Sequence, residues 1–238
     1  MIDRTGPTRR PDRPVSGYQK WRHLLFMHWA IPVDVLRPMV PAELTLDVHE
    51  GVAYIGVVPF VMQDVRPWRW WPTAAAFNFL ETNVRTYVHC QGRPGVYFFS
   101  LDAGSRLAVS AARHGWGLPY YYAQMNIQQQ GEQIHYETIR KTGPRHTVDY
   151  SIGPALEPSQ PGSLEFFLLE RYLLFVQRRQ RVYVGQVHHR PYPAQQVQSV
   201  HVHDELIAAS GLPQPGGDPC CAHYAQGVDV EIFDLKPL

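Results

Sequence analysis

Short apolar runs and alternating apolar-polar runs, separated by Gly, Pro and Asn turn residues, follow one another along most of the chain. The run at 52–60 is apolar at every position, which is typical of a strand covered on both faces. Further strands are predicted at 21–29, 79–88, 95–102, 120–128, 133–140, 147–152, 182–188, 197–202 and 228–233. The pattern therefore predicts one large antiparallel, meander-like sheet, and a sheet of this size tends to curl or close on itself.

The run at 79–88 carries the most information, because strict alternation separates two chemically different strand faces. The even positions hold small or β-branched residues, which suit packing. Polar and aromatic side chains occupy the odd positions: Phe79, Glu81, Asn83, Arg85 and Tyr87. This face predicts either the wall of a ligand site or a buried polar network that fixes the strand register, since buried charges are normally paired.

Four segments predict short helices: 33–37, 105–114, 164–177 and 205–210. The third is the longest, with Ser163 as its N-cap and an apolar spacing that predicts a core-facing side. The predicted fold class is α+β, mainly β, with one domain over residues 17–238 and a few helices flanking the sheet. Residues 1–16 are rich in Arg and Pro and predict a flexible N-terminal arm.

Length and charge exclude several classes of partner. The 238 residues are 45% hydrophobic, which suffices for one full core. Lys plus Arg number 22 against 21 Asp plus Glu, so the net charge of +1 provides no field for nucleic acid or an anionic membrane. We see no targeting pattern and no apolar run long enough to span a membrane. These features predict a soluble, cytoplasmic protein, and they leave a homo-oligomer open.

Cysteine and histidine positions assign no metal or cofactor. Cys90, Cys220 and Cys221 are too few and too irregular for a disulfide framework, and the adjacent pair lacks the CxxC spacing. His201 and His203 share one strand face, which fits either a metal site or an ordinary strand end followed by a helix cap. We find no third ligand, phosphate loop, Ser-His-Asp signature or dinucleotide fingerprint, and therefore predict no metal and no cofactor.

A series of longer motifs runs along most of the chain after residue 17. They are His28-Trp29, Ile31-Pro32, MVPAEL at 39–44, VPF at 58–60, FLETNVRTYV at 79–88, GVYFFSLD at 95–102, GLPYYYA at 117–123, ERY at 170–172 and VHHRPYP at 187–193. Together they resemble the uncharacterised DUF2071, or YqjF-like, family of the acetoacetate decarboxylase-like superfamily. This resemblance implies a cone-shaped antiparallel β-barrel with flanking helices, which agrees with the strand pattern.

The resemblance also bears on the chemistry. Acetoacetate decarboxylases carry a Gly-x-Pro-Lys-Lys run, in which one lysine forms a Schiff base and its cationic neighbour lowers its pKa. Alignment with Gly117-x-Pro119 places Tyr120 and Tyr121 at the two lysine positions, and a phenol cannot form an iminium. The three lysines of the chain stand elsewhere, before the first strand, in a turn and near the C-terminus: Lys20, Lys141 and Lys236. Schiff-base decarboxylation is therefore predicted to be absent.

The odd face of 79–88 supplies the predicted site. By the resemblance, Glu81 matches a pocket carboxylate of the decarboxylases, and we expect it to be a general base whose pKa is raised by partial burial. Arg85 lies about 13 Å further along the strand and is expected to bind a substrate carboxylate through two hydrogen bonds. Other predicted contacts are a hydrogen bond to a carbonyl oxygen from Tyr120 or Tyr121, and two neighbours on the strand: Asn83 and Tyr87.

Two functions remain open on these grounds. The first is an enzyme that acts on an organic acid or ketone without a Schiff-base lysine. The second is a non-catalytic ligand-binding or structural domain that has kept the barrel and lost the ancestral chemistry. For the tyrosine run, packing with a satisfied hydroxyl is the alternative to a catalytic role.

Overall fold

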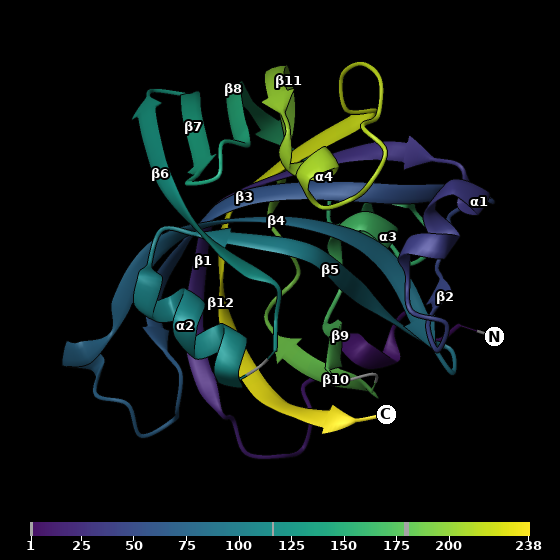
Figure 1. The fold of residues 1–238 in the computed structure, drawn as a ribbon, viewed down its shortest axis with the longest axis vertical. Helices are drawn as coiled ribbons and strands as arrows, with labels where there is room; N and C mark the ends of the chain where they lie inside the picture. Colours follow the sequence, from purple (N-terminus) through teal and green to yellow (C-terminus); the bar gives the residue numbers. More distant parts are fainter. Residues whose placement is uncertain (1, 116, 179–180) are drawn as a thin grey trace.

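The computed structural model describes residues 2–115, 117–178 and 181–238 (Figure 1). Its strands are β1 (Gly17–Ile31), β2 (Thr45–Leu46), β3 (Ala53–Arg66), β4 (Phe77–Cys90), β5 (Arg93–Ala103), β6 (Tyr120–Gln130), β7 (Gln133–Arg140), β8 (Arg145–Ala155), β9 (Leu173–Arg178), β10 (Arg181–His188), β11 (Ala194–Asp204) and β12 (Cys221–Pro237). The α-helices are α1 (Val33–Leu36), α2 (Arg106–Gly115), α3 (Leu164–Leu169) and α4 (Leu206–Ala209). Short 3-10 turns cover Gly6–Thr8, Arg37–Met39 and Thr73–Ala75. None of these described helices has the length and apolar character needed to cross a bilayer.

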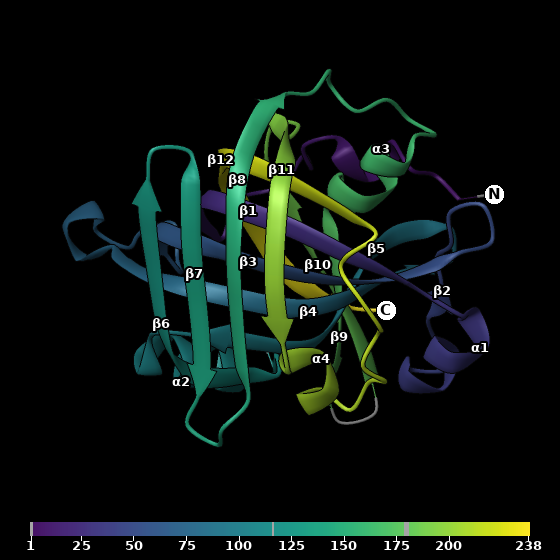
Figure 2. The same cartoon turned by 90° about the horizontal axis from the view of Figure 1, so that it is seen from above.

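The strands join into one sheet that closes into two rings with shared walls. The smaller ring runs β12-β1-β3-β4-β5-β9-β10 and closes through the pairing of β10 with β12. The larger ring uses the same β12, β1, β3, β4 and β5 and continues through β6, β7, β8 and β11. Figure 1 shows β6, β7, β8 and β11 above the shared strands and β9 and β10 below them, and Figure 2 shows the first group in front. The mainly β class with flanking helices is thereby confirmed.

The observed sheet differs from the predicted antiparallel meander in two parallel strand pairings. β5 runs parallel to β6 over Leu101–Ala103 and parallel to β9 at Val96 and Tyr97, whereas the other pairings among the described strands are antiparallel. β5 is therefore the branch point at which the smaller and larger rings part.

Successive residues of the shared strands face different interiors. On β1, Leu25 packs into the large core with Tyr136 of β7, while Leu24 packs into a second core with Phe60 of β3. On β4, Val84 packs into the large core and Glu81 faces the smaller ring. This arrangement confirms the separation of faces predicted for 79–88. The two-sided burial predicted for 52–60 is confirmed over 53–60, whereas Val52 precedes the strand and is exposed.

The predicted helix over 164–177 is wrong in its second half. Ser163 is the N-cap, with its Oγ accepting a hydrogen bond from the Phe166 N–H, but α3 ends at Leu169. Glu170 leaves the helix with φ −86° and ψ 74°, and the chain then forms β9. β9 pairs with β10 on one side and β5 on the other. Apolar spacing alone could not reveal the pairing with β5, which lies far away in the sequence, whereas β10 begins soon after the end of β9.

The N-terminal segment lies against the barrel in this structure. The Asp3 N–H donates to the Gly92 carbonyl oxygen at 2.9 Å. Arg4 reaches the buried Asp47, whose Oδ2 lies 2.5 Å from Arg4 Nη1 and 2.7 Å from Nη1 of Arg171. The segment predicted as a flexible arm thus supplies one partner of a buried charge.

Candidate active site

A cavity of about 170 Å³ lies inside the smaller ring. Apolar side chains form most of its wall, including Phe60, Phe98 and Leu174. A cavity near 150 Å³ can hold benzene, so this one suits a ligand of roughly six to ten non-hydrogen atoms. The polar side chains on the wall come from five segments of the chain: Gln19, Glu81, Arg85, Tyr120, Arg171, Tyr172 and Tyr192.

Glu81 is 3% exposed and projects from β4 toward this cavity. The Tyr120 hydroxyl donates a hydrogen bond to Glu81 Oε2 at 2.6 Å. Burial raises the pKa of Glu81 to about 7, because it removes water from the ionised carboxylate; hydrogen bonds from Tyr120 and Asn83 oppose this rise, and the charge of Asp102 adds to it. Burial and the neighbouring carboxylate raise the pKa of Tyr120 well above its ordinary value, so it remains a donor. Glu81 can therefore accept or release a proton near neutral pH.

Arg85 is a buried cation without a carboxylate partner. Arg85 is 8% exposed. Within the part of the chain that the structure describes, no carboxylate lies within ion-pair distance of its guanidinium. Nη2 donates to the Leu168 carbonyl oxygen at 3.3 Å, and Nε has no hydrogen-bond partner among the described residues. Because a buried charge is costly unless it is paired, this guanidinium is suited to bind an anion in the cavity.

Tyr87 supports Arg85 and does not form the cavity wall. Its ring is fully buried, its hydroxyl donates to the Leu168 carbonyl oxygen at 2.8 Å, and His28 Nε2 lies 2.6 Å from the same hydroxyl. Arg85 Nη2 lies 3.5 Å from the Tyr87 hydroxyl oxygen. Asn83 is also buried and lies beside Glu81, with its Oδ1 unpartnered among the described residues. The structure thus places both residues behind the wall, as supports for Arg85 and Glu81.

The two tyrosines at the aligned lysine positions have different surroundings. Tyr120 reaches Glu81, whereas Tyr121 is 40% exposed and its ring lies 4.1 Å from the Arg140 guanidinium carbon, away from the cavity wall. Consecutive strand residues point to opposite faces, so only one of the pair can face the cavity. That rule was available from the sequence, but the choice of Tyr120 over Tyr121 required the strand register that the structure supplies.

Arg171 is a wall residue that sequence reasoning did not single out. It follows α3 directly, and its Nη1 donates to the buried Asp47 at 2.7 Å. Burial lowers the pKa of Arg171 to about 10, while the charge of Asp47 opposes that shift. The ERY motif at 170–172 was the one sequence feature that pointed to Arg171, but the helix predicted over 164–177 gave no reason to place this residue on a cavity wall.

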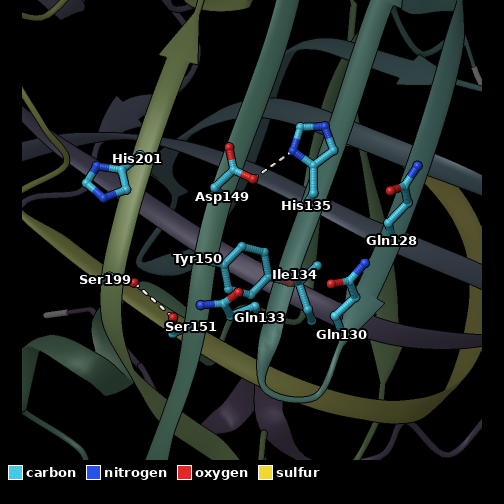
Figure 3. Close-up of a pocket in the computed structure, with 10 residues that line it drawn as sticks. All are labelled: Gln128, Gln130, Gln133, Ile134, His135, Asp149, Tyr150, Ser151, Ser199 and His201. Carbon is cyan, nitrogen blue, oxygen red and sulfur yellow. Dashed lines mark hydrogen bonds and ion pairs between the residues drawn. The ribbon is translucent and has the colours of Figure 1, made fainter.

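A larger hollow, of about 370 Å³, lies on the outer face of β6, β7, β8 and β11 (Figure 3). Two pairs of its side chains bond to each other: His135 Nδ1 lies 2.8 Å from Asp149 Oδ1, and Ser151 lies 3.0 Å from Ser199. His201 faces Asp149 across the strands. No three potential metal ligands converge anywhere in the described ranges. Exposed, mutually bonded side chains make this face a weaker candidate than the internal cavity.

Histidines 201 and 203 lead into a helix cap in this structure. Asp204 Oδ2 accepts a hydrogen bond from the Ile207 N–H at 3.0 Å, at the start of α4. Its other oxygen lies 2.8 Å from Nδ1 of the buried His146. His203 lies 3.5 Å from Glu205 on the exposed side. These contacts fit the strand-end reading of the segment.

Comparison with known proteins gives one family and one fold. The DUF2071 profile, described as an uncharacterised conserved protein, matches residues 18–229. The uncharacterised protein YqjF of Bacillus subtilis (strain 168) is 38% identical over 221 residues, which is 92% of this chain and 90% of YqjF.

Solved structures share the fold at low sequence identity. The enduracididine biosynthesis enzyme MppR complexed with pyruvate has a TM-score of 0.67 at 11% identity, over 95% of this chain and 91% of that one. The acetoacetate decarboxylase of Legionella pneumophila has a TM-score of 0.63 at 13% identity, over 98% and 92%. At such identities the likeness concerns the fold alone.

Proposed function

Because the chain belongs to the DUF2071 family and has the acetoacetate decarboxylase-like fold, we propose that the cavity of its smaller ring binds a small organic acid. One observation carries this proposal. Arg85 places a buried guanidinium on the cavity wall with no carboxylate within ion-pair distance of it in the described chain. The pyruvate bound by MppR, a protein of the same fold, is a carboxylate of the kind proposed.

The roles of the other wall residues follow from their positions. The ligand carboxylate accepts hydrogen bonds from Arg85, and its body lies against apolar residues such as Phe98 and Leu174. Glu81, with a pKa of about 7, takes a proton from the ligand or from water. Tyr120 donates to Glu81 in this structure and turns to a ligand carbonyl oxygen once Glu81 carries the proton.

The reaction proposed for this site uses no lysine. All three lysines are described, and none of them lines the cavity. The tyrosine that replaces a lysine inside, Tyr120, has no amine. In a borohydride trap with a keto acid, we expect the intact mass of the protein to stay unchanged, and an adduct on any lysine would contradict this reading.

A second candidate function is ligand binding without turnover. The same Arg85 supports it, because that residue binds an anion whether or not a reaction follows. The tyrosines at the two aligned lysine positions favour it, since they remove the ancestral chemistry. The two functions differ in what Glu81→Gln does: it abolishes turnover in an enzyme and leaves affinity nearly unchanged in a binding domain.

A thermal-shift screen tests the binding proposal. Short keto acids, hydroxy acids and simple monocarboxylates are compared with the matching amides and alcohols. A carboxylate at 100 times its dissociation constant should stabilise the fold by about 2.7 kcal/mol, which is a shift of several degrees. We expect this shift in wild type and in Arg145→Ala, an exposed control on β8, and not in Arg85→Ala. Equal shifts in Arg85→Ala, or shifts from the amides and alcohols alone, would overturn the proposed role of Arg85.

A further inference from the structure

Cys220 and Cys221 lie side by side at the point where the loop after α4 enters β12, apart from the cavity wall. Their Sγ atoms are 3.9 Å apart, and neither is in a disulfide. Cys220 is exposed and Cys221 is half-buried against a cluster that includes Tyr54 and Phe167. One thiol of the pair is therefore open to solvent, and the other is held directly behind it.

The backbone holds the first thiol in place. The Cys220 N–H donates to the His28 carbonyl oxygen at 2.8 Å, and the Cys220 S–H donates to the same oxygen at 3.2 Å. Cys221 pairs with His28 across β1 and β12. The sulfur pair is thus anchored to the rim of the sheet.

The contact between the thiols makes them unequal. The hydrogen bond from Cys221 lowers the pKa of Cys220 below the usual value of a thiol. The same hydrogen bond, together with burial, raises the pKa of Cys221. An exposed cysteine whose sulfur lies 3.9 Å from a second thiol is the arrangement in which an oxidised cysteine is resolved by its neighbour.

We propose that Cys220 and Cys221 form a redox-active dithiol that a hydroperoxide oxidises to a disulfide between the two adjacent residues. The Cys220 thiolate attacks the terminal oxygen of the hydroperoxide; the O–O bond breaks, and the departing oxygen takes a proton and leaves as an alcohol or water. Cys220 becomes a sulfenic acid. Cys221 sulfur then attacks the Cys220 sulfur, and the hydroxyl leaves with the Cys221 proton as water.

Atoms and electrons balance in this reaction. Two thiols and one hydroperoxide give one disulfide, one alcohol or water from the hydroperoxide, and one water from the sulfenic acid. The two sulfurs lose two electrons and the peroxide gains them. Adjacent Cα atoms are about 3.8 Å apart, whereas most disulfides join Cα atoms about 4.4–6.8 Å apart, so the product is strained and easily reduced. The site is therefore reversible.

Mass spectrometry of the full chain, treated with a small molar excess of hydrogen peroxide, tests the proposal. We expect the intact mass to fall by two hydrogen atoms, two of the three thiols to disappear, and dithiothreitol to restore both. Cys90→Ser should behave like wild type. Cys221→Ser should gain one oxygen atom, which dimedone traps on Cys220, and Cys220→Ser should lose the reaction.

Three results would overturn the proposal. One is the same loss of two hydrogen atoms in Cys220→Ser or Cys221→Ser, which would assign the bridge to another pair. The second is a disulfide-linked dimer on a non-reducing gel in place of the internal bridge. The third is a wild-type protein that retains all its thiols at peroxide levels that oxidise free cysteine. None of these outcomes depends on whether the cavity binds an organic acid.

Discussion

Two sets of buried charged side chains, each with one carboxylate and one guanidinium, lie on opposite sides of the wall formed by β4 and β5. In the larger ring, Asp102 accepts hydrogen bonds from Nε and Nη2 of Arg140 at 2.5 and 2.8 Å, and the two side chains are 0% and 5% exposed. In the smaller ring, Glu81 and Arg85 are similarly buried but have no oppositely charged partner among the described residues. The fold depends on both members of a pair that neutralises itself, because loss of one leaves the other charge buried and uncompensated, whereas charges left unneutralised beside a cavity are available to a ligand.

The largest effect is expected where the neutralised pair is broken. Arg140→Met leaves the Asp102 carboxylate buried without its cation, so the free energy of unfolding should fall by about 3–5 kcal/mol in urea titrations. The double variant Asp102→Asn with Arg140→Met should recover a large part of that loss. A single variant within about 1 kcal/mol of wild type would show that the pair is not structural.

The pH dependence of stability should report Glu81. Its pKa of about 7 in the folded protein lies above the ordinary 4.5, so the folded state binds more protons than the unfolded state between these values. This contribution is fully present below about pH 4.5 and is lost as the pH rises through 7, a loss of about 3 kcal/mol. Urea midpoints at pH 5 and pH 8 measure it. Glu81→Gln should lack this loss, and a variant with the wild-type slope would assign the slope to another group.

Tyr120 and Tyr121 provide a matched pair of smaller changes. Tyr120→Phe removes the donor to Glu81 and should cost about 1 kcal/mol at pH 8, and it should move the pH transition of Glu81 upward. Tyr121→Phe keeps the exposed ring beside Arg140 and should stay within about 0.5 kcal/mol of wild type at every pH. Equal effects of the two variants would contradict the placement of only Tyr120 in the site.

A change in stability far below that at Arg140 is expected at the unpaired cation. Arg85→Met removes a buried charge without leaving a carboxylate unpaired, so the free energy of unfolding should stay within about 1 kcal/mol of wild type. The same substitution at Arg140 serves as the matched comparison. A loss at Arg85 as large as the loss at Arg140 would mean that Arg85 is structural, and the comparison between the two rings would fail.

The success of prediction from sequence varied with the range of the interactions involved. Alternation along 79–88 separated the face of Glu81 from the face of Val84, because side-chain direction on a strand is a local property. The family motifs identified the fold. The end of α3 at Leu169 was missed because the strand that follows pairs with β5, which lies far away in the chain. The place of Arg171 was missed because its partner, Asp47, is equally distant in the sequence.

The shared strands have a consequence for how such a protein can change over generations. Odd positions of β4 such as 81 face the small chamber, and even positions such as 84 face the large core. Mutation can therefore replace the reactive side chains at odd positions of β4, while selection keeps the even positions that hold the core together. A lineage can lose one activity and acquire another on this strand without passing through an unfolded ancestor.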